Sequence, residues 1–292
     1  APLRRAALVA GWLVAGIPSC LAGVRSGDTL HVEGWFKPVL LVPLAVLARH
    51  RGARVVLNPH LTFSRDRRRA PEAVMRWLAR RADAVLATSD VDHRRIEGWG
   101  APAVRVGLVV DVPHPDHALI AAWRDRWQAA DGSRRVVLLA GRLRPDKGLD
   151  VLVRAASLWP LDLRLAVVGE DDGALAPARR LAADLGVDME VDEGHQPLDH
   201  FVAAVAAADL VACPYRQAGQ SAVLALAAAL GRPTVASDAG GLPELASVVV
   251  PVGDPHALAA GVEQALTSPP RRPSDDPVGT YVEAYGLLTV TP

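Results

Sequence analysis

The chain has very few lysines and cysteines. Of its 32 basic residues only Lys37 and Lys147 are lysines, and all the others are arginines. The two cysteines, Cys20 and Cys213, lie far apart in the sequence, which excludes a disulfide framework. This cysteine content is typical of a protein of the reducing cytoplasm.

Several sequence signatures are also missing. No Gly-x-Gly-x-x-Gly is followed by an acidic residue about twenty positions later, which argues against a dinucleotide-dependent oxidoreductase. Basic residues do not alternate with aromatic ones and no zinc-finger spacing occurs, so no nucleic acid partner is expected. A repeat of about 20 to 50 residues is absent too, which argues against a solenoid.

What the sequence does contain is a large hydrophobic fraction. Half of the 292 residues are hydrophobic, and the length suits two domains of about 150 residues each. The net charge is zero, but residues 1–130 hold 19 Arg and Lys against 11 Asp and Glu, whereas residues 131–292 hold 13 against 21. Two domains of opposite sign facing one another, an anionic partner of the first domain, or arginines that only solvate helices would each explain this asymmetry.

Residues 6–24 form an uncharged stretch behind Arg4 and Arg5, with the length of a membrane span or a signal peptide. The Ala and Gly content of the stretch and its Pro18 favour a buried helix of a folded domain instead. Because the chain does not begin with methionine, we also expect that an upstream segment is missing.

Apolar runs alternate with helical patterns along the whole chain, which predicts parallel sheets built from β-α-β units. The first series of expected strands covers residues 29–32, 54–57, 84–88 and 104–110, with helices at 38–50 and 71–82. The second series has strands at 135–140, 163–168, 189–191, 210–213, 234–237 and 248–252, with helices at 149–158, 174–185, 198–207, 220–230 and 255–267. Two prolines and an Asp-Gly-Ser turn place the boundary between the series at residues 111–133.

The most informative motif is Gly-Arg-Leu-Arg-Pro-Asp-Lys-Gly at residues 141–148. An apolar run precedes it and a helical pattern follows it, so Arg142 and Lys147 lie on a strand-to-helix loop. Ligands bind at the carboxyl ends of the strands in open parallel sheets, where a guanidinium and an ammonium group can neutralise phosphate oxygens. An ordinary loop with solvated charges is the alternative.

Two other loops of the second series follow strands in the same way. Gly169 and Glu170 end one strand, and the glycine lets a ligand approach the backbone, although a plain turn would have the same sequence. Gly194 and His195 follow the next strand, where the backbone can contact the flat edge of a base, and a structural role is the commoner one for a lone histidine.

A third loop leads into an Ala-rich helix that begins near Gln220-Ser221-Ala222-Val223. The first turn of a helix presents unpaired N–H groups and the positive end of the helix dipole, which suit a diphosphate. Ser221 or Gln220 can cap this helix. Alanine is also simply a strong helix former, which is the alternative explanation.

These motifs occur in a fixed order: Gly-Arg-x4-Lys-Gly, Val-Val-Gly-Glu, Ala-Asp-Leu-x-x-x-Pro and Leu-Gly-Arg-Pro-x-Val-Ala-Ser-x-x-Gly-Gly-x-Pro-Glu. Through them the chain resembles the retaining, nucleotide-sugar-dependent glycosyltransferases of family 4 over residues 28–266. The resemblance implies the α/β fold called GT-B, with two Rossmann-like, doubly wound parallel-sheet domains facing a central cleft. It assigns residues 1–125 to the acceptor-side domain, truncated at its N-terminus, and residues 126–274 to the donor-binding domain. A helix at 275–292 would cross back to complete the first domain.

The resemblance also implies roles for individual residues. Arg142 and Lys147 would hold the donor diphosphate and stabilise the leaving nucleoside diphosphate without a metal or a cofactor, the substrate being a UDP- or GDP-sugar. His60 falls where the family places a histidine that contacts the transferred sugar, and a solvent-facing histidine is the alternative. The residues that would bind the donor are Gly141, Arg142, Lys147, Gly169, Glu170, Gly194, His195, Gln220, Ser221, Ala222 and Val223.

Two features depart from the family pattern. Many members carry Glu, seven residues and a second Glu where this chain has Ala218 and Leu226, so other groups must hold the ribose. The opening strand and Gly-rich loop of the acceptor domain have no counterpart in residues 1–27. The expected function is therefore transfer of a sugar to a glycan, lipid or small-molecule acceptor, or alternatively non-catalytic binding of a nucleotide sugar.

Arginines crowd the middle of the first domain, at positions 65, 67, 68, 69, 76, 80 and 81. A basic amphipathic helix there would bring a cytoplasmic enzyme to anionic lipid, and to a lipid-linked acceptor, at the inner face of the membrane. A solvated helix face is the alternative.

Overall fold

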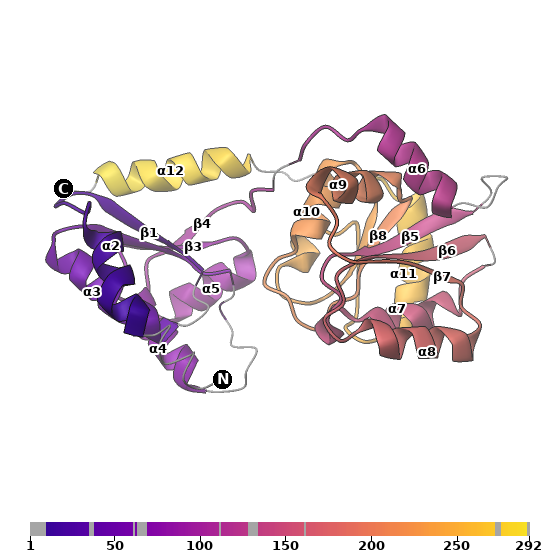
Figure 1. Ribbon diagram of the computed structural model, residues 1–292, viewed down its shortest axis with the longest axis horizontal. Coiled ribbons are helices and arrows are strands. Elements are labelled where there is room, and N and C mark those ends of the chain that lie inside the picture. Colours follow the sequence, from indigo (N-terminus) through magenta and orange to yellow (C-terminus); the bar gives the residue numbers. More distant parts are fainter. Residues whose placement is uncertain are drawn as a thin grey trace. The chain divides into compact units, whose positions relative to one another are not determined.

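The computed structural model describes residues 10–34, 38–60, 62, 69–110, 112–127, 134–160, 162–271 and 276–290. The chain divides into two compact units, residues 1–107 together with 277–292, and residues 108–276. Each unit contains one parallel sheet covered by helices (Figure 1). The predicted α/β fold with two parallel-sheet domains is confirmed.

The sheet of the first unit has the strand order β1-β2-β3-β4. Its strands are β1 (Thr29–Glu33), β2 (Arg54–Asn58), β3 (Ala84–Ala87) and β4 (Ala103–Arg105). Its helices are η1 (Trp12–Gly16), α2 (Ile17–Leu21), α3 (Pro38–His50), α4 (Arg69–Ala79), α5 (Asp90–Gly98) and α12 (Pro277–Val290). Right-handed crossovers between successive strands carry α3, α4 and α5 to the same face of the sheet.

The helix α12 covers the opposite face of this sheet (Figure 1). Ala284 of α12 is buried against Val56 and Leu86, which point away from the core formed with α2 to α5. The Thr280 hydroxyl accepts a hydrogen bond of 2.8 Å from the backbone N–H of Gly107. The helix α12 thus packs on the first unit, although the 169 residues of the second unit lie between it and the rest of the first unit in the sequence.

The sheet of the second unit has the strand order β10-β9-β8-β5-β6-β7. Its strands are β5 (Arg135–Ala140), β6 (Leu163–Gly169), β7 (Met189–Glu193), β8 (Leu210–Cys213), β9 (Thr234–Ser237) and β10 (Val248–Val250). Its helices are α6 (His117–Trp127), η2 (Pro145–Lys147), α7 (Leu149–Ala156), α8 (Leu175–Leu185), α9 (Leu198–Ala207), α10 (Ala222–Ala229), η3 (Leu242–Glu244) and α11 (Pro255–Thr267).

This strand order is that of a doubly wound dinucleotide-binding sheet. The chain leaves β5 toward β6 and β7 on one side and returns with β8 on the other side of β5. Successive side chains of the central strand alternate between two cores, with Val136 and Leu138 in one and Val137 and Leu139 in the other. Burial on both faces explains why these strands are continuous apolar runs.

Helix α6 belongs to the second unit because its tryptophans pack on α9. Trp123 and Trp127 are buried in a core that includes Val202, and the Trp123 indole donates a hydrogen bond of 3.1 Å to the carbonyl oxygen of His200. The division in the structure therefore falls after residue 107, whereas the sequence placed it after residue 125.

The apolar stretch at residues 6–24 is described from residue 10 onward. It forms the short helices η1 and α2, and Ile17 and Leu21 are buried against the first sheet's core. Among the residues that the structure describes, no helix has both the length and the apolar character needed to span a bilayer.

Candidate active site

The carboxyl ends of β5 and β8 mark the point where the winding of the second sheet reverses direction. A crevice forms outside the strand ends at such a point, and it is where ligands bind in doubly wound sheets. The loop after β5 contains η2 and carries Arg142 and Lys147, and the loop after β8 leads to α10. The topology therefore brings the two predicted anion-binding segments to adjacent strand ends.

The Lys147 side chain contacts the loop that leads into α10. Its Nζ atom is 3.6 Å from the centroid of the Tyr215 ring, and the Tyr215 hydroxyl is 3.4 Å from the Ser221 Oγ atom. Ser221 is the N-cap of α10, and its side chain accepts a hydrogen bond of 3.3 Å from the N–H of Leu224. The Tyr215 side chain thus contacts both the Lys147 ammonium group and the N-cap of α10.

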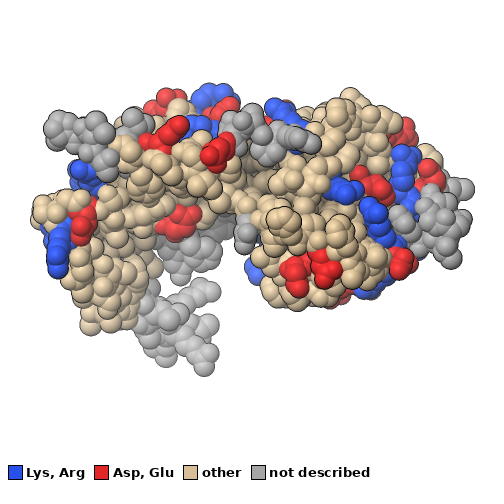
Figure 2. Space-filling view, turned by 90° about the horizontal axis from the view of Figure 1, so that it is seen from above, with Lys and Arg blue, Asp and Glu red and all other residues tan. Residues whose placement is uncertain are grey.

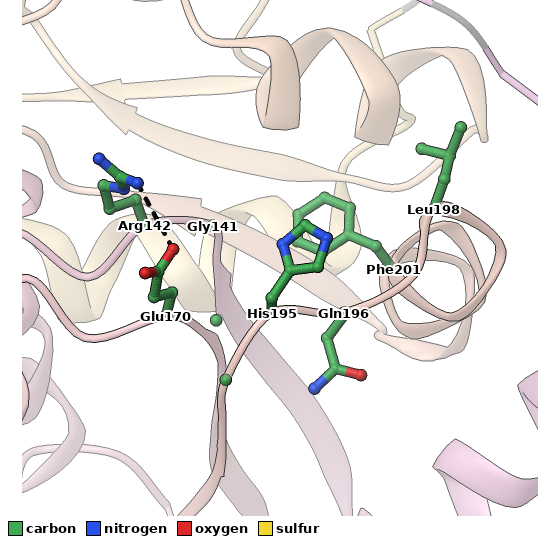
Figure 3. A pocket seen from close by; sticks show the side chains of 9 residues that line it. Gly141, Arg142, Glu170, His195, Gln196, Leu198 and Phe201 are labelled. Carbon is green, nitrogen blue, oxygen red and sulfur yellow. Dashed lines mark hydrogen bonds and ion pairs between the residues drawn. The ribbon is translucent and has the colours of Figure 1, made fainter.

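A pocket of about 410 Å³ opens beside the ends of β5, β6 and β7 (Figure 3). Glycines end or follow these strands, and Gly141, Gly169 and Gly194 all have positive φ angles, of 104°, 146° and 132°. A Cβ atom on Gly169 would overlap the carbonyl oxygen of Gly141, so only glycine lets these two strand ends approach so closely. The pocket is lined by Gly141, Arg142, Gly169, Glu170, Gly194, His195, Gln196, Leu198 and Phe201.

Arg142 lies at one end of this pocket, beside the carboxylate of Glu170 (Figure 3). Its guanidinium is 3.4 Å from Glu170 and 4.0 Å from Asp172, and 58% of its side chain is exposed. Such an exposed pair holds its partners weakly, so an incoming phosphate can replace the carboxylates. Figure 3 shows His195 and Phe201 away from the arginine, on the other side of the pocket.

The structure therefore sorts the predicted donor-binding residues into two neighbouring groups. Those at residues 141, 142, 169, 170, 194 and 195 line the pocket, whereas Lys147 and residues 220–223 lie at the loop that caps α10. The groups adjoin one another, because a Cβ atom on Gly141 would lie 3.4 Å from a methyl carbon of Val223.

Sequence reasoning missed several residues of this region. Gln196, Leu198 and Phe201 line the pocket because α9 starts directly after the Gly194-His195 loop, a position that the predicted helix start at residue 198 already implied. Tyr215 was missed as the contact of Lys147. Its place two residues after a strand end was the one available signal.

The two positions that depart from the family pattern are buried. Ala218 is 7% exposed and packs beside Gly240, and Leu226 is 3% exposed in the core of the second unit. The loop after β9 holds this arrangement through a hydrogen bond of 2.8 Å from the N–H of Gly241 to the carbonyl oxygen of Gly219. A carboxylate is absent from both positions, which are part of the packed interior.

His60 lies in the first unit, in a polar cluster around Glu33. The His60 Nε2 atom is 3.1 Å from one carboxylate oxygen of Glu33, and His31 is 2.9 Å from the other. The Asn58 amide donates to both oxygens, at 2.9 and 3.1 Å, and lies 3.1 Å from the hydroxyl of Tyr281. Since 63% of the His60 side chain is exposed, the imidazole is both oriented and accessible.

Helix α12 contributes tyrosines to this cluster. The Tyr285 hydroxyl hydrogen-bonds His31, and burial raises the pKa of both Tyr281 and Tyr285. These phenols therefore remain neutral hydrogen-bonding groups, and the chain's last helix helps to hold the strand-end cluster of the first unit.

Three arginines of α4 and the turn after it surround an exposed tryptophan. A groove of about 630 Å³ is lined by Glu72, Ala73, Arg76, Trp77, Arg80 and Arg81. The Arg81 guanidinium lies 4.1 Å from the centroid of the Trp77 ring, and Arg76 pairs with Glu72. The side chains of the arginines at 65, 67, 68 and 69 lie outside the described part of the chain. On the face shown in Figure 2, basic and acidic side chains of the described residues lie beside one another in several places.

Comparison with known proteins agrees with this architecture. Residues 1–110 match the family model "Glycosyl transferase 4-like domain", and residues 134–268 match "Glycosyl transferases group 1". A D-inositol 3-phosphate glycosyltransferase of Mycolicibacterium gilvum is 32% identical over 62% of the chain and 46% of its own length. A protein of the same name from Mycobacterium tuberculosis is 30% identical over 83% of the chain and 54% of its own length. The chain thus spans about half the length of the curated relatives it matches.

Solved structures share the fold. HepE of Anabaena, in complex with UDP, superposes with a TM-score of 0.79 at 19% identity, over 96% of this chain and 84% of that one. Sucrose-phosphate synthase of Thermosynechococcus elongatus superposes with a TM-score of 0.67 at 22% identity, over 86% of this chain and 65% of that one. With its two family-model matches, its relatives and its two parallel-sheet units, the chain belongs to the GT-B glycosyltransferases of family 4.

Proposed function

We propose that this chain transfers a sugar from a nucleoside diphosphate sugar to a hydroxyl acceptor with retention of configuration. The observation that carries the proposal is the Lys147 ammonium beside the capped N-terminus of α10, at the reversal point of a doubly wound sheet. A diphosphate is the ligand that an ammonium group and a helix N-terminus suit together.

In the proposed reaction the bond between the anomeric carbon and the diphosphate oxygen breaks. Negative charge grows on that oxygen, and Lys147, Arg142 and the first N–H groups of α10 stabilise it. The acceptor oxygen bonds to the anomeric carbon, and its proton passes to the departing diphosphate oxygen. Each preorganised donor of this kind can contribute about 10²- to 10³-fold in rate. The proposal uses the chain's own cations for this purpose and requires neither a metal nor a cofactor.

The pocket at the ends of β5, β6 and β7 would take the base of the nucleotide. Its volume of about 410 Å³ lies in the range of small-molecule sites. Glycine backbone at residues 169 and 194 leaves room for a flat ring, and Phe201 provides an apolar surface. Because HepE was solved with UDP and with UDP-glucose, we propose a UDP-sugar as the donor and a GDP-sugar as the alternative to be tested beside it.

The acceptor would bind the first unit, where His60 would contact the transferred sugar. The names of the curated relatives include a small phosphorylated polyol, inositol 3-phosphate, which makes small polyols candidates beside glycans and lipid-linked acceptors. The His60 Nε2 atom lies 3.1 Å from a carboxylate oxygen of Glu33 and the side chain is largely exposed, as a contact to a sugar hydroxyl requires.

We further propose that α4 contacts anionic lipid from the cytoplasmic side. Trp77 is 36% exposed among Arg76, Arg80 and Arg81, and tryptophan with basic residues suits a membrane interface. Flotation with vesicles should recover the protein with phosphatidylserine and not with phosphatidylcholine alone. Equal recovery from both vesicle types would contradict the lipid contact.

The transfer activity is tested by replacing Lys147 in the full-length protein. We expect Lys147→Ala to lower turnover of the nucleotide sugar by about 10²-fold. Arg154→Ala is the matched control, because Arg154 is an exposed cation of α7, the helix that follows Lys147. Unchanged turnover in Lys147→Ala would contradict the proposal.

The alternative function is a non-catalytic nucleotide-sugar-binding module, which the apolar residues at 218 and 226 favour. Calorimetric binding of UDP or GDP without any sugar transfer or donor hydrolysis by the full-length protein would support it. Turnover by that protein would exclude it.

A further inference from the structure

The face of the Tyr215 ring lies against the Lys147 ammonium, with the Nζ atom 3.6 Å from the ring centroid. This distance is well within the range of cation–π attraction. We propose that Tyr215 is a positioning residue, whose ring holds the Lys147 ammonium beside the first turn of α10 for the donor diphosphate. The inference deepens the proposed function and rests on it.

The ring is a fixed platform. Tyr215 is 1% exposed, and its hydroxyl lies 3.4 Å from the N-cap Ser221. The Ser237 hydroxyl donates a hydrogen bond to the Tyr215 carbonyl oxygen, and the Tyr215 N–H donates to the carbonyl oxygen of Cys213 at 2.8 Å. The position of the ring relative to α10 is therefore set by β8, β9 and the helix cap.

The ring also remains a neutral phenol. Burial raises the pKa of Tyr215 well above its ordinary value, and the nearby Cys213 thiol, whose pKa burial also raises, adds to the shift. The ammonium of Lys147 therefore meets the face of a neutral aromatic ring and forms no ion pair with a phenolate.

Hydrogen bonds also hold the segment around Lys147 to the loop after β8. The Arg216 N–H donates to the carbonyl oxygen of Asp146 at 2.8 Å, and the Arg216 guanidinium donates to the carbonyl oxygen of Pro145 at 2.8 Å. The same guanidinium binds both carboxylate oxygens of Asp150, at 2.9 and 2.6 Å. Residues on both sides of Lys147 are thus tied to the loop after β8.

Because these contacts hold the backbone, Tyr215 can determine the direction of the long Lys147 side chain. A lysine that is already aimed loses less side-chain entropy when a diphosphate binds. Loss of the ring face should therefore weaken diphosphate binding about 3- to 30-fold, the range that corresponds to a cation–π contact. Loss of the hydroxyl alone should matter less, because the ring face is retained.

The test uses the chain's two lysines. Lysine in the full-length protein is selectively labelled with ¹³C, which gives signals from Lys37, Lys147 and any lysine outside this sequence. The signal that disappears in Lys147→Arg is that of Lys147. In wild type we expect the ε-methylene protons of Lys147 to be shielded by the Tyr215 ring. The shielding should persist in Tyr215→Phe and disappear in Tyr215→Leu. Titration with UDP should give a Kd near that of wild type for Tyr215→Phe and a 3- to 30-fold higher one for Tyr215→Leu.

The wild-type spectrum tests the contact even if Tyr215→Leu fails to fold. If the Lys147 protons are unshielded in wild type but UDP still shifts the Lys147 signal, the role of Tyr215 is overturned and the proposed function is not. Shielding that Tyr215→Leu leaves unchanged would overturn it as well. Shielded protons that neither UDP nor GDP displaces would overturn the proposed function, and with it the purpose of the positioning.

Discussion

The two sheets differ in the side-chain clusters at the carboxyl ends of their strands. In the second unit these ends carry glycines, the cations Arg142 and Lys147, and the N-terminus of α10. In the first unit β1 ends in the carboxylate of Glu33, which is surrounded by histidine, asparagine and tyrosine side chains. In the proposed function, the same β-α-β architecture would provide the site for the donor diphosphate in one unit and a hydrogen-bonding site for the acceptor in the other.

Among substitutions that leave the side chains of the predicted anion site in place, the largest effect should come from moving the cation loop off β8. Gly148 has φ of 70°, and a Cβ atom there would overlap the carbonyl oxygen of Pro214. Gly148→Ala should therefore displace Lys147 and weaken UDP binding about tenfold or more, as loss of a charge-assisted contact does. Calorimetry measures this Kd.

Gly186→Ala is the matched control for that substitution. Gly186 has nearly the same φ, 67°, but a Cβ atom there meets nothing within 4 Å. It should cost about 1 to 2 kcal/mol of unfolding free energy through backbone strain and leave the UDP Kd unchanged. Equal losses of UDP affinity in both variants would show that loop displacement is not the cause.

A smaller effect is expected from the ion pair between Arg216 and Asp150. Burial raises the pKa of Asp150, but the hydrogen bond and charge of Arg216 outweigh it, so that the pKa lies below its ordinary value of 3.8. A lowered pKa means that the pair stabilises the fold above pH 3.8 and stops doing so as the pH falls through the lowered value. Because both side chains are about two-fifths exposed, the contribution should be at most about 1 kcal/mol.

Denaturant unfolding of wild type and Asp150→Asn at several pH values measures this contribution. The difference in unfolding free energy should be constant between about pH 7 and pH 5 and should vanish at the acidic end of the titration. A difference that grows as the pH is lowered would contradict the assignment of the pair.

The smallest effect should come from Glu33 in the first unit. Glu33→Leu removes the partner of His60, and since both side chains are more than half exposed, turnover should fall by no more than about fivefold. ¹⁵N shifts of the His60 imidazole should report loss of one preferred tautomer. Glu72→Leu, which breaks the exposed pair with Arg76, is the control, and an equal change at His60 in that variant would refute the role of Glu33.

Most of the fold could be predicted because buried parallel strands are continuous, mostly apolar runs. The predicted strands at 135–140, 210–213 and 234–237 match β5, β8 and β9 to the residue. Helix α5 was missed, since its sequence has few apolar residues and it depends on the Ser89 cap and on burial of Ile96. The strand predicted at 104–110 ends at Arg105, because the chain leaves the sheet after the N–H of Val106 bonds Ala87.

The candidate site was predictable in its charges and less so in its contacts. Glycines and cations at strand ends are visible in the sequence, and so is a helix start such as that at Ser221. The direction of the Lys147 side chain depends on Tyr215, which lies 68 residues away and is brought close by the pairing of β5 with β8. Such contacts follow from tertiary packing, and no local pattern encodes them.

The proposed function requires that Lys147 and the start of α10 bind a diphosphate. Calorimetric Kd values for UDP and for uridine, measured with wild type and Lys147→Ala, test it most directly because the two ligands differ only in the diphosphate. We expect wild type to prefer UDP strongly, and Lys147→Ala to lose about 1.5 to 3 kcal/mol of that preference, the value of a charged hydrogen bond. The same preference for UDP over uridine in both proteins would contradict the account.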